Sequence, residues 1–141
     1  MRAVRALLKN LDAPWCLSPQ DSVFDALNTL ASHDVGALMV MDQGKLVGIL
    51  SERDYTRKIA LLGKSSKDTL VGDIMTAKVL TVAANSRTED CMTLMSQKKI
   101  RHLPVFDGDK VLGMISIRDI MDEIIADQEA TINQLQNYIA S

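Results

Sequence analysis

The chain of 141 residues is long enough for one domain or for two small intertwined halves. Apolar residues make up 47% of it and aromatic residues only 4%, so it can bury a core, which must be mainly aliphatic. The formal net charge of −2 argues against a nucleic-acid partner held by bulk electrostatics, and no apolar stretch is long enough to cross a membrane.

The first half of the chain predicts a strand, a helix, two strands and a second helix. A short amphipathic helix over 1–9 and a turn at 11–14 precede a short strand at 15–17. A capping box at 22–25 begins the first main helix, because its Ser side chain can accept from the backbone N–H three residues on. Gly36 ends this helix. The apolar residues of the helix follow the spacing of one buried face: Val23, Ala26, Leu27, Leu30 and Ala31.

Two apolar runs, at 37–41 and 45–50, flank a turn at 42–44 that contains a glycine. This arrangement predicts a β-hairpin. Ser51 then caps a helix expected over 52–62, because the apolar run stops there and the helical spacing begins.

The second half repeats this order at a constant offset of 65 residues (113 − 48 = 65). It predicts a short strand at 79–82, a capping box at 86–89, a hairpin formed by 103–106 and 110–115, and a last helix capped by Ser116. The residues that are identical at this offset include Asp25 and Asp90, Leu38 and Leu103, Val40 and Val105, Asp42 and Asp107, Lys45 and Lys110, Gly48 and Gly113, Ser51 and Ser116, Arg53 and Arg118, and Asp54 and Asp119.

One seven-residue motif, at 48–54 and again at 113–119, holds four of these pairs. Each copy ends a strand and opens a helix, where free backbone N–H groups and the helix dipole favour an anion such as a phosphate. The motif Asp, an acceptor-only group, suits the two hydroxyls of a ribose. Ser-x-x-Asp is also a plain capping box that needs no ligand. The joint repetition of Gly, Ser, Arg and Asp favours the ligand interpretation.

A strand–helix–strand–strand–helix unit present twice predicts an α+β fold built as a pseudo-dimer within one chain. Neither copy buries much surface by itself, so the copies should pack together with both motifs facing a shared cleft. The expected parts are an N-terminal helix over 1–12, a first repeat over 13–62, a linker over 63–72, a second repeat over 73–125 and a C-terminal helical extension over 126–141.

The last helix is expected to run from Arg118 to about Ile139. Ile132, Leu135 and Ile139 form an apolar stripe near its end. This stripe is too short for a coiled coil, but it can dock on a partner subunit. We therefore expect a homodimer.

The cysteines and histidines indicate no redox or metal chemistry. Cys16 and Cys91 form no disulfide framework, so we expect two small buried thiols in a reducing compartment, the cytoplasm. His33 and His102 have no carboxylate or Cys at ligand spacing, so no metal is expected. No nucleophile–base pair is visible either, which argues against an enzyme.

The repeated residues resemble a known family, the tandem pair of CBS domains named after cystathionine β-synthase and also called a Bateman module. The resemblance covers about residues 15–121. It rests on the doubled motif, on Asp-Ile-Met-Thr at 73–76 and on Ile-Arg-His-Leu-Pro-Val at 100–105. Ser-Glu-Arg-Asp-Tyr at 51–55 is typical of small stand-alone bacterial members and their organellar relatives. The resemblance implies a binding module rather than a catalyst.

The resemblance implies that an adenine nucleotide binds in the cleft between the copies. AMP is the expected ligand, with ADP, ATP, NAD(H) and S-adenosylmethionine as the others. In the family, the motif Asp contacts the ribose hydroxyls, the motif Ser contacts ribose or phosphate, nearby basic residues contact phosphate, and the first strand and hairpin hold the adenine. Carried over to this chain, the candidate nucleotide-binding residues are Ser51, Arg53, Asp54, Thr76, Val79, Thr81, Arg101, His102, Leu103, Ser116, Arg118 and Asp119.

The two copies differ in their supply of phosphate donors. Gly36 and Ala37 stand where the second copy has Arg101 and His102. We therefore expect two unequal sites, of which the site at 113–119 is the better supplied.

As a regulator, the chain would report its nucleotide to an unknown protein partner through a population shift. Three other functions stay open. A redox-linked NAD(H) sensor would need pocket volume beyond the phosphate end. An enzyme of nucleotide metabolism would show turnover of AMP, ATP or NAD. A purely structural dimerisation module would use the motifs only as caps, and Asp119→Ala would then affect stability alone.

Overall fold

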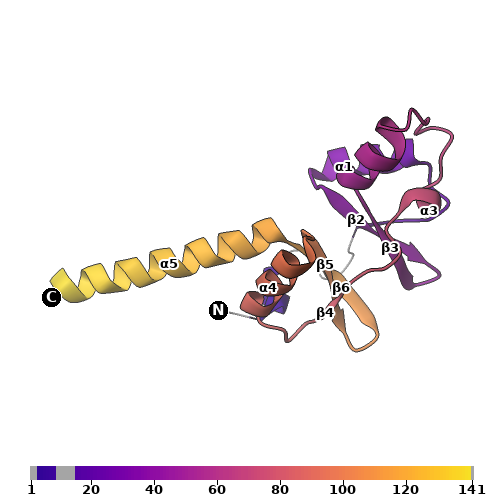
Figure 1. Ribbon diagram of the computed structural model, residues 1–141. Helices are drawn as coiled ribbons and strands as arrows, with labels where there is room; N and C mark the ends of the chain where they lie inside the picture. The colour runs from indigo at the N-terminus through magenta and orange to yellow at the C-terminus, as the bar shows by residue number, and fades with distance from the viewer. Residues whose placement is uncertain (1–2, 9–14, 141) are drawn as a thin grey trace. The chain divides into compact units, whose positions relative to one another are not determined.

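The computed structural model describes residues 3–8 and 15–140, which form two compact units. The first unit comprises residues 15–80, and the second unit comprises residues 3–8 together with 81–140. Each unit holds one three-stranded sheet and its own helices (Figure 1). The predicted α+β class, with two copies of one unit and a long C-terminal helix, is therefore confirmed.

The helices and strands follow the predicted order in both units. The first unit contains β1 (Cys16–Leu17), α1 (Val23–His33), β2 (Ala37–Asp42), β3 (Lys45–Ser51), α2 (Glu52–Tyr55), the π-helical turn η2 (Thr56–Ala60) and α3 (Val71–Ile74). The second unit contains the 3₁₀ turn η1 (Val4–Leu7), β4 (Val82–Ala83), α4 (Thr88–Lys98), β5 (His102–Asp107), β6 (Lys110–Ser116) and α5 (Ile117–Ala140).

The two sheets have the same topology. β2 lies between β1, which is parallel to it, and β3, which is antiparallel to it, and β5 lies likewise between β4 and β6. Both sheets carry a register shift at the same place, after Val40 in β2 and after Val105 in β5. The turn between β2 and β3 uses positive φ at Gln43 (50°) and Gly44 (77°), as a tight hairpin requires. The two predicted hairpins are confirmed.

The two main helices begin differently. The Ser22 hydroxyl accepts from the backbone N–H of Asp25 at 3.0 Å, so the predicted cap of α1 is confirmed. α4 begins after Arg87, whose side chain makes no capping hydrogen bond. The predicted capping box at 86–89 is therefore wrong.

The predicted end of α1 at Gly36 is also wrong. α1 ends at His33, because Asp34 takes up the left-handed backbone conformation (φ 53°) that stops a helix. Gly36 instead accepts from the backbone N–H of Glu52 at 2.9 Å.

β4 begins at Val82, later than the predicted start of its strand at 79. β1 pairs with β2 through Cys16 and Met39, and the equivalent pair in the second unit would be Thr81 and Pro104. Proline has no backbone N–H to donate to a ladder. β4 has two residues, as β1 has, but its pairing with β5 begins one position later, at Val82 and Val105, beyond the proline.

Residues 3–8, the described part of the predicted N-terminal helix, belong to the second unit. Within these residues, Val4–Leu7 form a single 3₁₀ turn. Val4 is fully buried, and its backbone N–H donates to Ser86 O at 2.9 Å. The predicted turn at 11–14 lies outside the described residues.

Residues 63–72, expected as a linker, pack back on the first unit. The backbone N–H of Phe24 donates to Ser66 O at 3.0 Å, and that of Val71 donates to Asp21 O at 2.8 Å. The boundaries between repeats and linker stay a prediction.

Each unit buries its own, largely aliphatic core. On the predicted face of α1, Val23, Ala26 and Leu30 are buried, whereas Ala31 is exposed. The core of the first unit consists of Leu17, Val23, Ala26, Leu30, Leu38, Val40, Leu50, Ile59, Val71 and Ile74. The core of the second unit consists of Val4, Ala84, Cys91, Met95, Leu103, Val105, Leu112, Ile115 and Ile120.

The two cysteines differ in burial. Cys91 is buried, as predicted, and burial raises the pKa of its thiol, with a further contribution from the charge of Asp90. Cys16 is exposed, which contradicts the prediction. In β1 the neighbouring Leu17 faces the core, so the alternation of a strand turns Cys16 outward.

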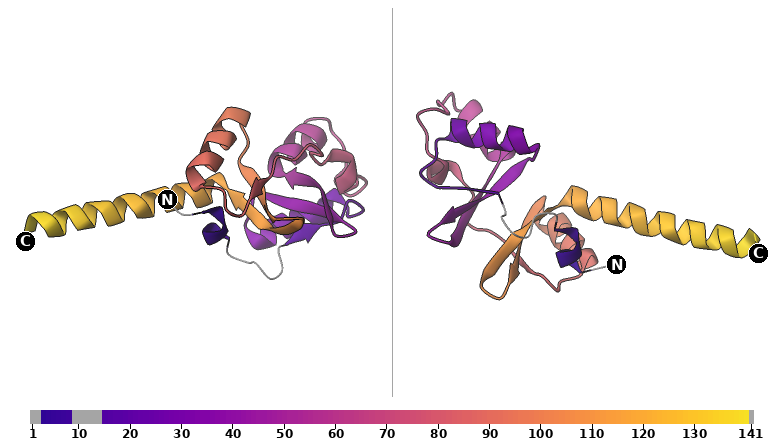
Figure 2. Two further views of the ribbon diagram at one scale, coloured as in Figure 1. Left: turned by 90° about the horizontal axis from the view of Figure 1, so that it is seen from below. Right: turned by 180° about the vertical axis from the view of Figure 1, so that it is seen from behind.

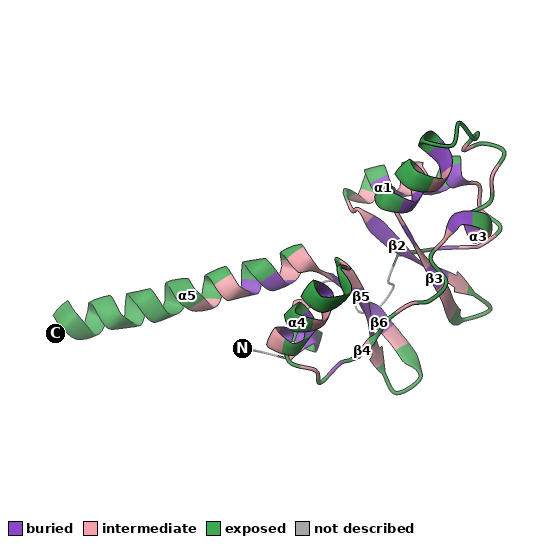
Figure 3. Cartoon of the chain, viewed as in Figure 1, coloured by how far each residue is buried: buried purple, intermediate pink, exposed green. Residues whose placement is uncertain are grey.

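α5 is a single helix of 24 residues that extends well beyond the rest of the second unit, as both views in Figure 2 show. Residues 128–140 are all exposed (Figure 3). Among the helices described here, none is both long and apolar enough to cross a membrane.

Candidate functional site

Both copies of the motif lie where a strand runs into a helix. In the first, the backbone N–H of Ser51 donates to Asp54 Oδ2 at 3.0 Å, and that of Asp54 donates to Ser51 Oγ at 3.2 Å. In the second, the backbone N–H of Ser116 donates to Asp119 Oδ2 at 2.8 Å, and that of Asp119 donates to Ser116 Oγ at 3.2 Å. Both pairs are therefore reciprocal caps, and any ligand role is added to that structural one.

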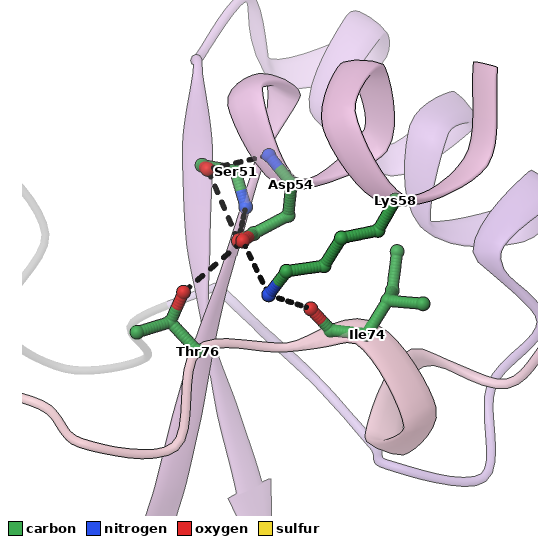
Figure 4. A network of polar contacts seen from close by, with 5 residues as sticks. All are labelled: Ser51, Asp54, Lys58, Ile74 and Thr76. Atoms are coloured by element: carbon green, nitrogen blue, oxygen red, sulfur yellow. Dashed lines mark hydrogen bonds and ion pairs between the residues drawn. The ribbon is translucent and has the colours of Figure 1, made fainter. Parts of the chain in front are cut away.

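In the first motif, further donors surround the Asp54 carboxylate (Figure 4). Its Oδ1 accepts from the Thr76 hydroxyl at 3.1 Å and lies 3.0 Å from Lys58 Nζ. Its Oδ2 accepts from the Ser51 hydroxyl at 3.1 Å, besides the backbone bond. A carboxylate offers about four lone-pair sites, and these protein groups address all of them. Asp54 is buried, with 7% of its surface exposed.

Gly48 explains how Thr76 reaches Asp54. Thr76 and Ile49 exchange two backbone hydrogen bonds, of 2.9 and 3.0 Å, so that the segment around Thr76 runs along β3. A Cβ on Gly48 would lie 2.6 Å from Met75 Sδ and 2.9 Å from Thr76 O. Only glycine leaves room for this close approach.

The second motif has basic neighbours. His102 pairs with Ser116 across β5 and β6, and the backbone N–H of Ile117 donates to Arg101 O at 2.8 Å. These contacts hold the start of β5 beside the start of α5. Asp119 is half-buried.

Burial lowers the pKa of His102, the nearby Asp119 acts in the opposite direction, and Arg101 lowers the pKa further. His102 is therefore mainly neutral at pH 7 and can both donate and accept a hydrogen bond. Arg101 and Arg118 are exposed, so their guanidinium groups are accessible to an anion. The second motif thus combines a carboxylate, an imidazole and two guanidinium groups.

The structure brings the candidate residues together in two groups, one in each unit. Ser51, Asp54 and Thr76 are in contact in the first unit. Arg101, His102, Ser116 and Asp119 are neighbours in the second unit. Arg53 and Thr81 are exposed, Val79 is half-buried, and Leu103 is completely buried in the core of the second unit.

Lys58 is the residue of this network that the sequence analysis missed. Its ammonium group contacts Asp54 and also donates to Ile74 O at 2.8 Å. The signal was present, because positions four apart on a helix face each other and often form ion pairs. Among the described residues, no group of three or more His, Cys, Asp or Glu side chains is placed to hold a metal ion.

Comparisons with known proteins agree with this architecture. The sequence profile of the CBS domain matches the chain twice, at residues 8–61 and 71–126. A mitochondrial CBS domain-containing protein of Arabidopsis thaliana, CBSX3, is 41% identical over 130 residues. The match covers 89% of this chain but only 63% of the Arabidopsis protein, so this chain spans less than two thirds of that relative.

Solved structures are similar over most of the chain. A putative signal-transduction protein with CBS domains from Burkholderia ambifaria shares 42% identity at a TM-score of 0.85, over 89% of this chain and 96% of that one. The CBS domain pair of protein MJ0100, solved with 5′-methylthioadenosine and S-adenosyl-L-methionine, shares 26% identity at a TM-score of 0.79 and covers 90% and 98% of the two chains. The chain therefore belongs to the CBS domain family and carries two copies of the domain.

Proposed function

We propose that this chain is a regulatory module that binds AMP at the second motif and signals its ligand state to a protein partner. CBS pairs generally bind adenine nucleotides or S-adenosylmethionine as regulatory modules, and stand-alone CBS proteins are typically regulatory rather than catalytic. The observation that carries the proposal is the group of polar side chains at the second motif: Arg101, His102, Ser116, Arg118 and Asp119.

The chemistry of this group fits a nucleoside monophosphate. A carboxylate such as Asp119 can accept from two vicinal ribose hydroxyls, and charge-assisted hydrogen bonds of this kind are stronger than neutral ones. The guanidinium groups of Arg101 and Arg118 present planar pairs of donors that match a phosphate. The two ligands in the MJ0100 structure both contain an adenosyl group, which supports an adenosine-containing ligand here as well.

Thermal unfolding tests this proposal with AMP, ADP, ATP, NAD, NADH and S-adenosylmethionine as separate additions. A ligand at about 100 times its Kd should stabilise the protein by about 2.7 kcal/mol. We expect the largest rise in Tm with AMP. A response only to NADH or NAD would favour the redox-sensor alternative, and no response to any of the six would contradict nucleotide binding.

Asp119→Ala locates the site, with Asp122→Ala as its matched control. Asp122 is an exposed carboxylate on the same helix. Loss of the cap by itself should cost on the order of 1 kcal/mol in the absence of ligand. The decisive quantity is therefore the ligand-induced increment in Tm, which should disappear in Asp119→Ala and persist in Asp122→Ala. An equal increment in both variants would move the site elsewhere.

We further propose that the chain forms a homodimer through the exposed apolar stripe of α5. The stripe extends further than the sequence analysis expected, because Met121 and Ile125 are also half exposed. It now comprises Met121, Ile125, Ile132, Leu135 and Ile139, each with at least 50% of its surface exposed. The spacing of three, four or seven residues places them on one helix face.

A further inference from the structure

Just after its motif, the first repeat has a lysine where the second repeat has a glutamate. Lys58 lies four residues after Asp54, and its Nζ is 3.0 Å from Asp54 Oδ1. At the offset of 65 residues, the place of Lys58 is taken by Glu123. A glutamate has the same charge as Asp119 and cannot form such an ion pair with it. The contact is thus specific to the first repeat.

We propose that Lys58, together with Thr76, closes the first motif to a ribose diol by occupying the acceptor sites of Asp54. This inference rests on the proposed function, because the excluded ligand is of the same class. A diol can be bound by a carboxylate only where acceptor sites are free. Asp54 Oδ1 already has the Lys58 ammonium and the Thr76 hydroxyl as partners, and Oδ2 accepts from the backbone N–H and the hydroxyl of Ser51, so the acceptor sites of this carboxylate are taken by the protein.

The burial of the Asp54 side chain makes the closure hard to reverse. The Asp54 side chain is 9% exposed, and that of Lys58 is 43% exposed. A buried carboxylate that loses its counter-ion is strongly destabilised. A ribose hydroxyl would replace a contact between two oppositely charged groups by a hydrogen bond in which only the acceptor is charged. A ligand would therefore have to break a better contact than the one it could make.

Lys58 is also fixed on its other side. Its ammonium donates to the carbonyl of Ile74, the last residue of α3, at 2.8 Å. Displacing Lys58 would leave this carbonyl without its donor. Lys58 and Thr76 together tie the junction of β3 and α2 to residues 74–76 (Figure 4). We call this set of contacts, made by Asp54, Lys58, Ile74 and Thr76, the clasp of the first motif.

A double-mutant cycle tests the clasp without any ligand. Asp54→Asn, Lys58→Met and the double variant are compared with the wild type by urea unfolding. Lys64→Met is the control, because it makes the same chemical change at an exposed position. Asp54→Asn and Lys58→Met should each lower the urea midpoint of unfolding. The double variant should lose clearly less unfolding free energy than the sum of the two single losses. Additive losses, or a Lys58→Met midpoint equal to that of Lys64→Met, would overturn the clasp.

Calorimetric titration with AMP tests the closure itself. Lys58→Met should show an additional AMP-binding event at the opened first motif, besides the event seen in the wild type. An unchanged titration would overturn the closure by Lys58. Weaker AMP binding in Lys58→Met would overturn the proposal, because Lys58 would then contact the ligand. If the wild type binds no AMP, the proposed function fails, while the cycle still decides whether the clasp exists.

Discussion

Gly48 and Gly113 occupy the same position of the two repeats but differ in what lies against them. A Cβ at residue 48 would meet Met75 Sδ at 2.6 Å and the backbone oxygen of Thr76 at 2.9 Å. A Cβ at residue 113 would meet, among the described residues, Leu8 Cδ2 at 3.2 Å. A backbone atom cannot yield as a flexible side chain can. At the residue scale, the two equivalent glycines therefore differ in how much room a side chain would have.

We expect Gly48→Ala to lower the free energy of unfolding by about 1–3 kcal/mol, the usual range for overpacking. Gly113→Ala should have a clearly smaller effect, because the terminal methyl group of Leu8 can move. Urea unfolding of the two variants measures the difference directly. Equal losses of unfolding free energy in the two variants would contradict the close packing of the segment around Thr76 against β3.

His102 should make stability depend on pH. Its pKa lies below 6.5, mainly because of burial, with Asp119 opposing the shift and Arg101 adding to it. The folded protein then binds fewer protons than the unfolded chain, so the free energy of unfolding falls as the pH drops below about 6.5 towards the folded pKa. The contribution of His102 to the free energy of unfolding is fully present above pH 6.5.

His102→Gln isolates this contribution from the carboxylates that also titrate in acid. The difference in unfolding free energy between about pH 7.5 and pH 5.5 should be larger in the wild type than in the variant. Guanidinium chloride unfolding at the two pH values provides the measurement. A wild type that loses no more than the variant would contradict a lowered pKa of His102.

At the scale of the element, replacing a serine by alanine at the start of each main helix should lower stability by different amounts in α1 and α4. The Ser22 hydroxyl caps α1, whereas the side chain of Arg87, the N-cap residue of α4, makes no capping hydrogen bond. Ser22→Ala should therefore cost about 0.5–2 kcal/mol of stability, and Ser86→Ala should cost much less. Urea unfolding of both variants decides. A larger loss for Ser86→Ala would restore the capping box that the sequence suggested.

Much of this architecture was visible in the sequence, because local signals produce it. Periodicity and hairpin turns locate the strands and helices, and the repeat locates both motifs. What could not be predicted depends on distant residues. Pro104 in the neighbouring strand displaces the pairing of β4 by one position, and residues 3–8 belong to the second unit although most of the chain lies between them in the sequence.

In the candidate site, too, contacts between residues close in sequence could be predicted and contacts between distant residues could not. The caps of Ser51 and Ser116 are local and were predicted as pairs with their aspartates. The Thr76 contact to Asp54 depends on how the segment after α3 returns to β3, which no spacing rule expresses. Lys58 could have been found from its helical spacing to Asp54, but a solvated helix face is the usual outcome for such a lysine.

At the scale of the whole molecule, the outer part of α5 presents a long accessible surface, because its residues 128–140 are all exposed. The helix carries apolar side chains in that region at Ile132, Leu135 and Ile139. Two copies of such a face can bury each other, since residues at alternating spacings of three and four form a continuous helix seam. The stripe is too short to be stable as a coiled coil by itself, so the dimer should be sensitive to single charges within it.

We therefore expect the double variant Ile132→Asp, Leu135→Asp to be a monomer under conditions in which the wild type is a dimer. Each aspartate would place a charge in an apolar seam, where burial without a partner is costly. Size-exclusion chromatography with light scattering gives the molar mass directly. Gln134→Asp is the control, because it adds a charge on the opposite side of the same exposed helix turn. A double variant that remains dimeric would assign the interface to another surface, and a wild type that is monomeric throughout would remove the homodimer altogether.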